Sequence, residues 1–303
     1  MEPVVVHRQQ QPQSGSKVPK SPSPWTIARR KFFQNKLAIA GLIFIVFIVT
    51  ISFLAPYITT YDPTRVDIKS IAKSPSADHL FGTDKGGRDV FTRLLYGGRI
   101  SLTIGFSITF FVIIIGTIVG AIAGYFGGIV DSLLMRFTDF ILVFPFLIFV
   151  IVLNSIFTES GVITLIFTIS TLSWGGTARM VRSKVLAEKE NEYILSAVSI
   201  GTSSTKVILR HLIPNVLSTV IVQATILLAA MIVVETGLTF LGFGVPANIP
   251  SWGNMISDAR SPDVIQYKPW IWLPPGLVLT LTILSINFVG EGLKDAFNPK
   301  SAR

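Results

Sequence analysis

Six long apolar segments, nearly free of charge, set the strongest limit on how this chain of 303 residues can fold. They cover approximately residues 37–57, 100–125, 140–157, 162–178, 216–243 and 270–290. Each reaches or approaches the roughly 20 residues with which an α-helix crosses about 30 Å of hydrocarbon. The fourth is the weakest, because Ser and Gly interrupt it near Trp174. The pattern predicts an all-α polytopic membrane protein with six transmembrane helices.

The composition agrees with a membrane protein. Half of the residues are hydrophobic, only 14% are charged, and the mean hydropathy is +0.61. The chain has no cysteine, which excludes a disulfide framework and thiolate chemistry. The net charge of +9 would suggest a nucleic-acid partner in a soluble protein. Here the enrichment of Lys and Arg in cytoplasmic loops explains it more simply, and we predict no nucleic-acid partner.

The Lys and Arg residues are divided unevenly between the two sides of the predicted spans. With the N-terminus inside, the inner segments hold 17 of the 26 Lys and Arg residues and the outer segments hold 9. This asymmetry predicts that both termini are cytoplasmic. We expect a cytoplasmic N-terminal tail (1–36), a transmembrane domain (37–290) and a cytoplasmic C-terminal tail (291–303). Within the first tail, residues 1–24 should be disordered, and the basic, amphipathic residues 25–36 should lie along the inner membrane surface.

A polar insert, EYILSAVSIGTSSTKVILRHLIPNV at residues 192–216, separates the fourth and fifth spans on the cytoplasmic side. Gly201 permits a turn, the Thr and Ser residues after it are good helix caps, and Pro214 suits the first turn of the next helix. We expect a helix, a sharp bend and a short second helix. That second helix has an apolar stripe of Val207, Ile208 and Leu212 and a basic edge of Lys206, Arg210 and His211. Such a helix could simply lie among the lipid headgroups.

This insert resembles the EAA loop of ABC-importer permeases, in the form found in the oligopeptide/dipeptide/nickel family. It has the acid-Tyr-aliphatic start, the two small residues, the Gly and the Pro thirteen positions later. It departs from the general pattern at Leu195, where Glu is usual, and at His211, where an aliphatic residue is usual. HLFGTDKGGRDVFTRLLYGGRISLTIG (79–105) and ETGLTFLGFGVPANIPSWGNM (235–255) resemble the same family in the same order. The resemblance covers residues 25–299 and points to the C-type permease subunit of an oligopeptide importer.

The resemblance implies a type I ABC-importer permease in the bacterial plasma membrane. It implies three kinds of protein partner: a second, B-type permease, two ATP-binding subunits and an extracytoplasmic peptide-binding protein. The coupling loop, about 179–215, would dock on an ATP-binding subunit. The residues expected to carry this coupling are Glu192, Tyr193, Ser196, Ala197, Gly201, Lys206, Arg210, His211 and Pro214. The resemblance leaves open whether the cargo is an oligopeptide, a dipeptide or nickel.

The motifs that are missing separate this interpretation from its alternatives. The chain has no GxxxxGK[ST] sequence, so we predict that it is not an enzyme and binds no cofactor, with ATP and Mg held by the partner ATPases. HExxH and GxSxG are also missing, which leaves intramembrane proteolysis without support. The alternative is an ion- or proton-coupled secondary transporter. Such transporters use intramembrane acids or His, and within the six predicted spans Glu235 is the only ionisable acid or base.

Two features of the predicted spans have specific interpretations. Gly116, Gly120 and Gly124 are spaced four apart, which predicts close helix packing rather than contact with the cargo. Glu235 could line the translocation path, or it could satisfy backbone groups where the fifth span ends.

Polar and aromatic residues outside the span interiors receive structural interpretations. Trp252, Trp270 and Trp272 are expected to be interfacial anchors. The segment GTDKGGRD, residues 82–89, resembles a metal or phosphate loop at first sight. Because its Asp and Arg residues are able to pair locally, we predict a structural turn and no metal.

Overall fold

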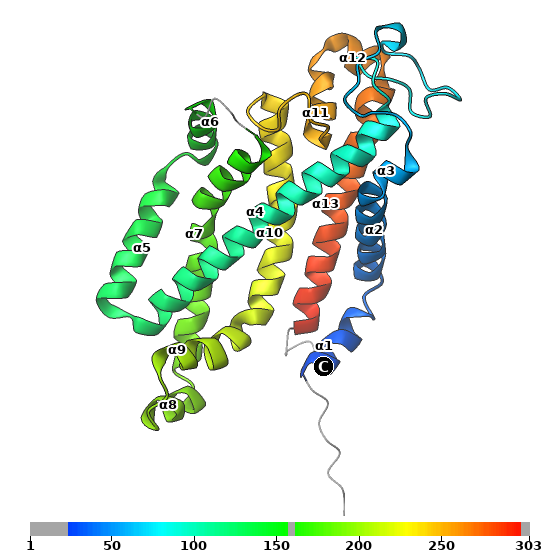
Figure 1. Ribbon diagram of the computed structural model, residues 1–303. Helices are drawn as coiled ribbons and strands as arrows, with labels where there is room; N and C mark the ends of the chain where they lie inside the picture. The colour runs from blue at the N-terminus through cyan, green and yellow to red at the C-terminus, as the bar shows by residue number, and fades with distance from the viewer. Residues whose placement is uncertain (1–23, 157–160, 298–303) are drawn as a thin grey trace, which may run out of the picture.

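The computed structural model describes residues 24–156 and 161–297. Within these residues, the regular secondary structure is helical apart from one isolated β-bridge between Thr83 and Asp89 (Figure 1). Residues 1–23, which make up almost all of the predicted disordered tail, lie outside the described residues. So do residue 157, the last of the predicted third span, and residues 298–303. The fold is therefore all-α, as the hydropathy pattern predicts.

The helices fall into a first half that ends at the chain segment after α6 and a second half that begins with α7. The first half contains α1 (Pro24–Phe32), α2 (Lys36–Phe53), α3 (Ala55–Ile58), η1 (Ile68–Ser70), α4 (Val90–Phe126), α5 (Gly128–Val143) and α6 (Phe146–Ile156). The second half contains α7 (Val162–Lys189), α8 (Glu192–Ser199), α9 (Ser204–Val207), η2 (Ile208–Leu212), α10 (Ile213–Leu241), α11 (Trp252–Ser257), η3 (Asp258–Arg260), α12 (Pro262–Tyr267) and α13 (Pro269–Phe297).

Four helices of the described chain are long and apolar enough to cross a membrane. They are α2, α4, the continuous run from α9 to α10 and α13. A fifth span exists if α5 and α6, which meet at an angle of 81°, cross together. α7 contains the predicted fourth span but is not apolar enough to be counted with the others. The chain is thus a membrane protein with several apolar helices, and the count of six stays a prediction.

The predicted third span, residues 140–157, is wrong in its continuity, because two helices share this apolar segment. Residues 128–139, which the sequence analysis assigns to an inner loop, belong to α5 instead. The helix then stops at Phe144, whose backbone is extended (φ −68°, ψ 134°). Phe144 precedes Pro145, and the residue before a proline avoids the helical conformation because it collides with the proline ring. This single dipeptide breaks the apolar segment into α5 and α6.

The helix after Gly201 also differs from the prediction, because it is not a separate short element. Residues 204–241 form one uninterrupted helix, in which η2 is a π-helical turn. The N–H of Ile213 donates to the carbonyl of Ile208, five residues back. Pro214 has no N–H to donate, and its ring disfavours the usual carbonyl position four residues back. The widened turn accommodates the proline without ending the helix.

The glycine stripe lies where α4 and α7 approach most closely. A Cβ on Gly116 would come within 2.6 Å of Thr177 Cβ, and a Cβ on Gly124 within 2.9 Å of Val185 Cβ. A Cβ on Gly120 would overlap the carbonyl oxygen of Ala178. Small residues let two helix backbones approach in this way. Beside the stripe, one core joins α4, α6, α7 and α10 through buried residues that include Ile104, Ile108, Val150, Leu165, Ile169 and Met231.

The other side of α7 carries α5, which is held by two ion pairs. Arg182 Nη2 donates to Asp131 Oδ2 at 2.6 Å, and Arg179 pairs with Asp139. Most other α5 side chains are half-buried or exposed in the single chain, and Thr138 is buried. α5 is therefore attached to α7 mainly along one face.

The connecting segments gather at the two opposite ends of the helices. α8 and α9 lie at the end where α1 also lies, whereas α3, α11 and α12 lie at the other end (Figure 1). At that second end Trp252 is fully buried and donates through Nε1 to the carbonyl of Leu94 at 3.1 Å. Its predicted role as an interfacial anchor is wrong, because the indole fills a core position that also satisfies its N–H.

Candidate coupling site

Gly201 closes α8 with a Schellman motif. Its φ is +82°, in the left-handed region that a glycine adopts without a Cβ penalty. The N–H of Gly201 donates to the carbonyl of Val198 at 2.9 Å, and the N–H of Thr202 to that of Ala197 at 3.1 Å. Ser203 occupies the N-cap position of α9, but its side chain makes no capping hydrogen bond. The sharp bend thus depends on the glycine rather than on the hydroxyl residues after it.

One side of the segment 192–216 is packed firmly against the transmembrane helices. Ile194, Val207 and Leu212 are fully buried. They share one core with Ala121 of α4, Val181 and Val185 of α7, and Val216 and Val220 of α10. The apolar stripe predicted for the second helix therefore packs on the protein itself. A segment anchored in this way moves together with α4, α7 and α10.

Tyr193 connects three helices near this packed side. Its hydroxyl donates to Glu188 at the end of α7 and accepts a hydrogen bond from the Asn215 side chain at the start of α10. Asn215 also donates to the carbonyl of His211 at 2.9 Å. Desolvation and the hydrogen bond to Glu188 raise the pKa of the Tyr193 hydroxyl, so it stays a donor at neutral pH. Glu188 and Asn215 belong to the site although the sequence analysis did not select them.

The opposite side of the segment is exposed and apolar. The side chains of Leu195, Val198 and Ile200 have exposed fractions of 51%, 46% and 83%, and we name these three residues the coupling face. Exposed hydrophobic groups that gather in one place usually mark a site of contact with another protein or with a membrane. The remaining coupling residues from the sequence analysis surround this face or lie on the following turn: Glu192, Ser196, Gly201, Lys206, Arg210 and Pro214 are exposed, His211 is half-buried and Ala197 is buried.

Two protein families match parts of the chain. Residues 116–303 match the family described as the inner membrane component of binding-protein-dependent transport systems. Residues 23–75 match the N-terminal TM domain of oligopeptide transport permease C. The chain belongs to this family of transport permeases. The permease is 40% identical over 281 residues to the oligopeptide transport system permease protein OppC of Haemophilus influenzae, which is 92% of this chain and 89% of that protein.

Other relatives carry similar names. The dipeptide transport system permease protein DppC of Alkalihalophilus pseudofirmus is 39% identical to the permease over 278 residues, covering 92% of this chain and 90% of the relative. The oligopeptide transport system permease protein OppC of Bacillus subtilis is 38% identical over 281 residues, covering 93% and 91%. The similarity therefore extends across nearly the whole permease, including residues 192–216, which we name the candidate coupling segment and, for short, the coupling segment.

Glu235 is fully buried within the permease, on the last two turns of α10. Its Oε1 accepts a hydrogen bond from the Thr239 hydroxyl at 3.0 Å, and its Oε2 accepts one from the Thr236 hydroxyl at 3.4 Å. Among the described residues, no Lys, Arg or His forms an ion pair with it. Because the carboxyl group is covered by its own chain, this conformation presents none of its surface to a path between two subunits.

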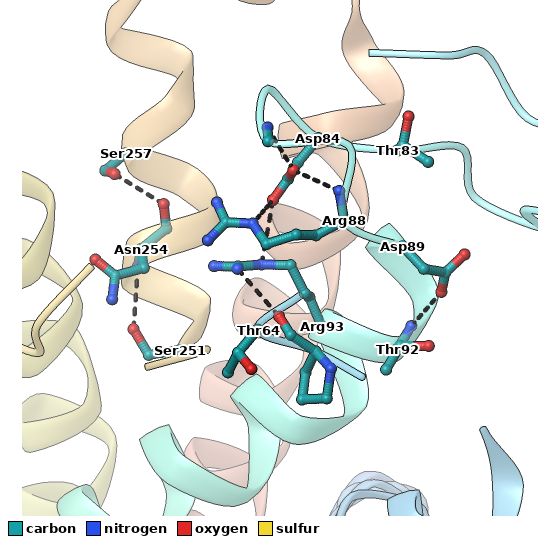
Figure 2. A network of polar contacts seen from close by, with 12 residues as sticks. Thr64, Thr83, Asp84, Arg88, Asp89, Thr92, Arg93, Ser251, Asn254 and Ser257 are labelled. Atoms are coloured by element: carbon teal, nitrogen blue, oxygen red, sulfur yellow. Dashed lines mark hydrogen bonds and ion pairs between the residues drawn. The ribbon is translucent and has the colours of Figure 1, made fainter. Parts of the chain in front are cut away.

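The segment 82–89 of the permease folds as an ionic turn at the same end as α11 (Figure 2). Asp84 accepts hydrogen bonds from two backbone N–H groups of the turn, and its Oδ2 lies 2.8 Å from Arg88 Nε and 3.3 Å from Arg93 Nε. Arg93 reaches on to the carbonyl of Pro63 at 3.3 Å. Burial, followed by the nearby charge of Asp84, raises the pKa of Asp258 in η3. The local Asp–Arg pairing matches the predicted structural turn.

Proposed function

We propose that this chain is the membrane-spanning permease subunit of a binding-protein-dependent ABC importer of oligopeptides. With a second, B-type permease it forms the translocation path, and it couples that path to ATP hydrolysis by two partner ATPases. The cargo follows from the relatives, whose names specify oligopeptide and dipeptide transport. ATP and Mg are bound by the partners, because the chain lacks a phosphate-binding glycine-rich loop.

The two-sided construction of the coupling segment is the observation that carries this proposal. Coupling between distant sites requires a contiguous element whose position both sites influence. The buried side, with Ile194 and Leu212, attaches the segment to the transmembrane helices. The coupling face is left for a partner, and the resemblance to the EAA loop identifies that partner as an ATP-binding subunit. A helix that only rested on lipid would not need the Tyr193 connection to α7 and α10.

The proposed assembly places each partner on a different surface. The ATPases dock on the cytoplasmic coupling face, and the extracytoplasmic binding protein docks on the loops at the opposite end. The second permease packs beside this one in the bacterial plasma membrane, because six helices are few to enclose a peptide-sized path. Both termini are cytoplasmic, and α7 together with the α5–α6 pair completes six spans.

Single-cysteine labelling should show this orientation, since the permease contains no cysteine of its own. A membrane-impermeant maleimide applied to intact cells should react at Lys73→Cys and Asp258→Cys. It should react at Lys206→Cys only after the membrane is permeabilised, because the inner segments carry most of the Lys and Arg residues. Labelling at position 206 from the external medium would contradict the orientation.

Experiments with purified components should show which subunits bind and hydrolyse ATP. The permease alone should neither bind nor hydrolyse ATP, whereas the complex with both permeases, both ATPases and the binding protein should hydrolyse ATP and take up peptide. A series of peptides of increasing length, measured in the same vesicles, would define the cargo. Stoichiometric ATP binding by the isolated permease, or uptake that follows a proton gradient without any ATPase, would refute the proposal.

A further inference from the structure

Glu235 lies near one end of an unusually long helix whose other end carries the coupling segment. Residues 204–241 form a single helix of 38 residues, which corresponds to a length of about 57 Å at 1.5 Å per residue. α9 lies at the end of the molecule near α8, and the chain leaves α10 toward α11 at the opposite end (Figure 1). A displacement applied at one end of this helix therefore reaches the other end with no hinge between them except the π-helical turn.

The Thr239 hydroxyl connects Glu235 to the segment that follows α10, residues 242–257, which we name the outer hairpin. The backbone N–H of Val245 donates to the Thr239 hydroxyl at 3.0 Å, and that hydroxyl donates to Glu235. A separate hydrogen bond holds the same hairpin to α4, because the backbone N–H of Trp252 donates to the Ser101 hydroxyl at 3.2 Å. Glu235 thus receives one relay, which begins at the backbone N–H of Val245 and passes through the Thr239 hydroxyl.

The outer hairpin fits tightly around Thr239. A Cβ on Gly244 would overlap the Thr239 hydroxyl, and a Cβ on Gly253 would come within 2.7 Å of Thr239 Cβ. Trp252 is fully buried between α4 and α13, in one core with Val90 and Leu94. A shift of the hairpin therefore requires that its hydrogen bond to the Thr239 hydroxyl break.

A buried acid without a cationic partner destabilises a fold unless hydrogen bonds compensate for its lost hydration. Here the hydroxyl groups of Thr239 and Thr236 provide that compensation, because each donates to an oxygen of the carboxyl group. We propose that Glu235 is a positioning residue that fixes the outer hairpin to the end of α10, so that movement of the coupling segment reaches the surface where the binding protein docks. The docking role of the hairpin rests on the proposed function, whereas its attachment through Glu235 does not.

The attachment is tested by the reactivity of a buried cysteine in the hairpin. Val245 is only 5% exposed, so Val245→Cys in the otherwise cysteine-free permease should react slowly with a maleimide. Thr239→Val removes the relay with little change in shape, and Glu235→Leu removes both acceptor oxygens of the side chain. Each should accelerate labelling by about tenfold or more, since each leaves buried polar groups unpaired. Equally slow labelling in both variants would overturn the proposal.

Two matched variants control for a general loss of stability. Thr282→Val removes another fully buried hydroxyl, but that hydroxyl bonds only to Val278 of its own helix, at 2.7 Å, so labelling should stay slow. Thr239→Ser keeps the relay and should also stay slow. If Thr282→Val accelerates labelling as much as Thr239→Val does, the loss of any buried hydroxyl loosens the permease, and the positioning role of Glu235 is wrong.

Transmission is tested separately in the assembled complex with its ATPases and binding protein. The binding protein should stimulate ATP hydrolysis in the parent, in Thr239→Ser and in Thr282→Val, and most of this stimulation should be lost in Thr239→Val and Glu235→Leu. Full stimulation in the last two variants, with the hairpin loosened, would refute transmission through Glu235. A parent complex that shows no stimulation and no peptide uptake would refute the proposed function and leave the labelling result unaffected.

Discussion

Gly201→Asp should leave the permease in the membrane at its normal level while abolishing both peptide uptake and association with the ATPases. A Cβ at Gly201 finds no neighbouring atom within 4 Å, so the permease itself has space for the side chain. The φ of +82° still disfavours residues other than Gly, by about 1–2 kcal/mol. The larger effect is the introduced charge, which would lose its hydration in a protein interface without an assured partner. Together these should weaken docking by roughly one to two orders of magnitude.

Three further variants separate the causes of this effect. Gly201→Asn has nearly the same shape as Asp, tolerates a left-handed backbone and carries no charge, so it should retain much more uptake. Gly201→Ala isolates the backbone strain. Thr205→Ser, on the exposed surface of α9, should change neither uptake nor association. Transport by Gly201→Asp at the wild-type rate would show that the coupling assignment is wrong and that the segment merely lies against lipid.

Gly120→Leu should have a second large effect, but on folding rather than on docking. A Cβ at Gly120 would overlap the Ala178 carbonyl and lie 2.8 Å from Val181 Cβ, so α4 and α7 have to separate before any larger side chain fits. Overpacking of this kind costs about 1–3 kcal/mol and sometimes more. We expect less permease in the membrane and a thermal unfolding midpoint in detergent that is lower by roughly 5 °C or more.

Gly176→Ala is the matched control, because Gly176 lies on α7 but has no atom within 4 Å of an added Cβ. An alanine there should leave the midpoint unchanged or raise it, since alanine favours helix over glycine by roughly 1 kcal/mol. Gly120→Ala should fall between Gly176→Ala and Gly120→Leu. A Gly120→Leu permease that is as abundant and as stable as the parent would show that α4 and α7 do not pack through this stripe.

Local signals in the sequence account for much of the fold. The turn at Gly201 follows from a lone glycine between two helix-forming stretches. The break at Phe144 was also readable, since Pro145 stands inside an apolar run, but a count of apolar residues passes over it. The start of α4 at Val90 was not readable from hydropathy, because two arginines and two glycines lower the hydropathy of its first turns. Contacts with Pro63 and Asp84 bury Arg93, one of these arginines. Asp89 caps this helix through the N–H of Thr92 at 2.7 Å.

The residues around the candidate site were predictable to different degrees. Glu235 and Thr239 are four apart on a helix, a spacing that places both side chains on one face. The hydrogen bond from the Trp252 N–H to the Ser101 hydroxyl joins positions more than a hundred residues apart, and no local pattern specifies it. The same holds for the Asn215 contact with Tyr193, which forms only after α8 folds back on the start of α10. Long-range polar pairs of this kind require the packed fold.

A photo-cross-linking experiment on the assembled complex tests the coupling assignment most directly. Ile200→Cys, whose parent side chain is 83% exposed on the coupling face, would be labelled with a benzophenone maleimide and irradiated. Lys73→Cys, at the opposite end of the molecule, is the control. The account predicts a covalent product between position 200 and an ATP-binding subunit and no such product from position 73. An intact complex in which position 200 gives no product with that subunit would contradict it.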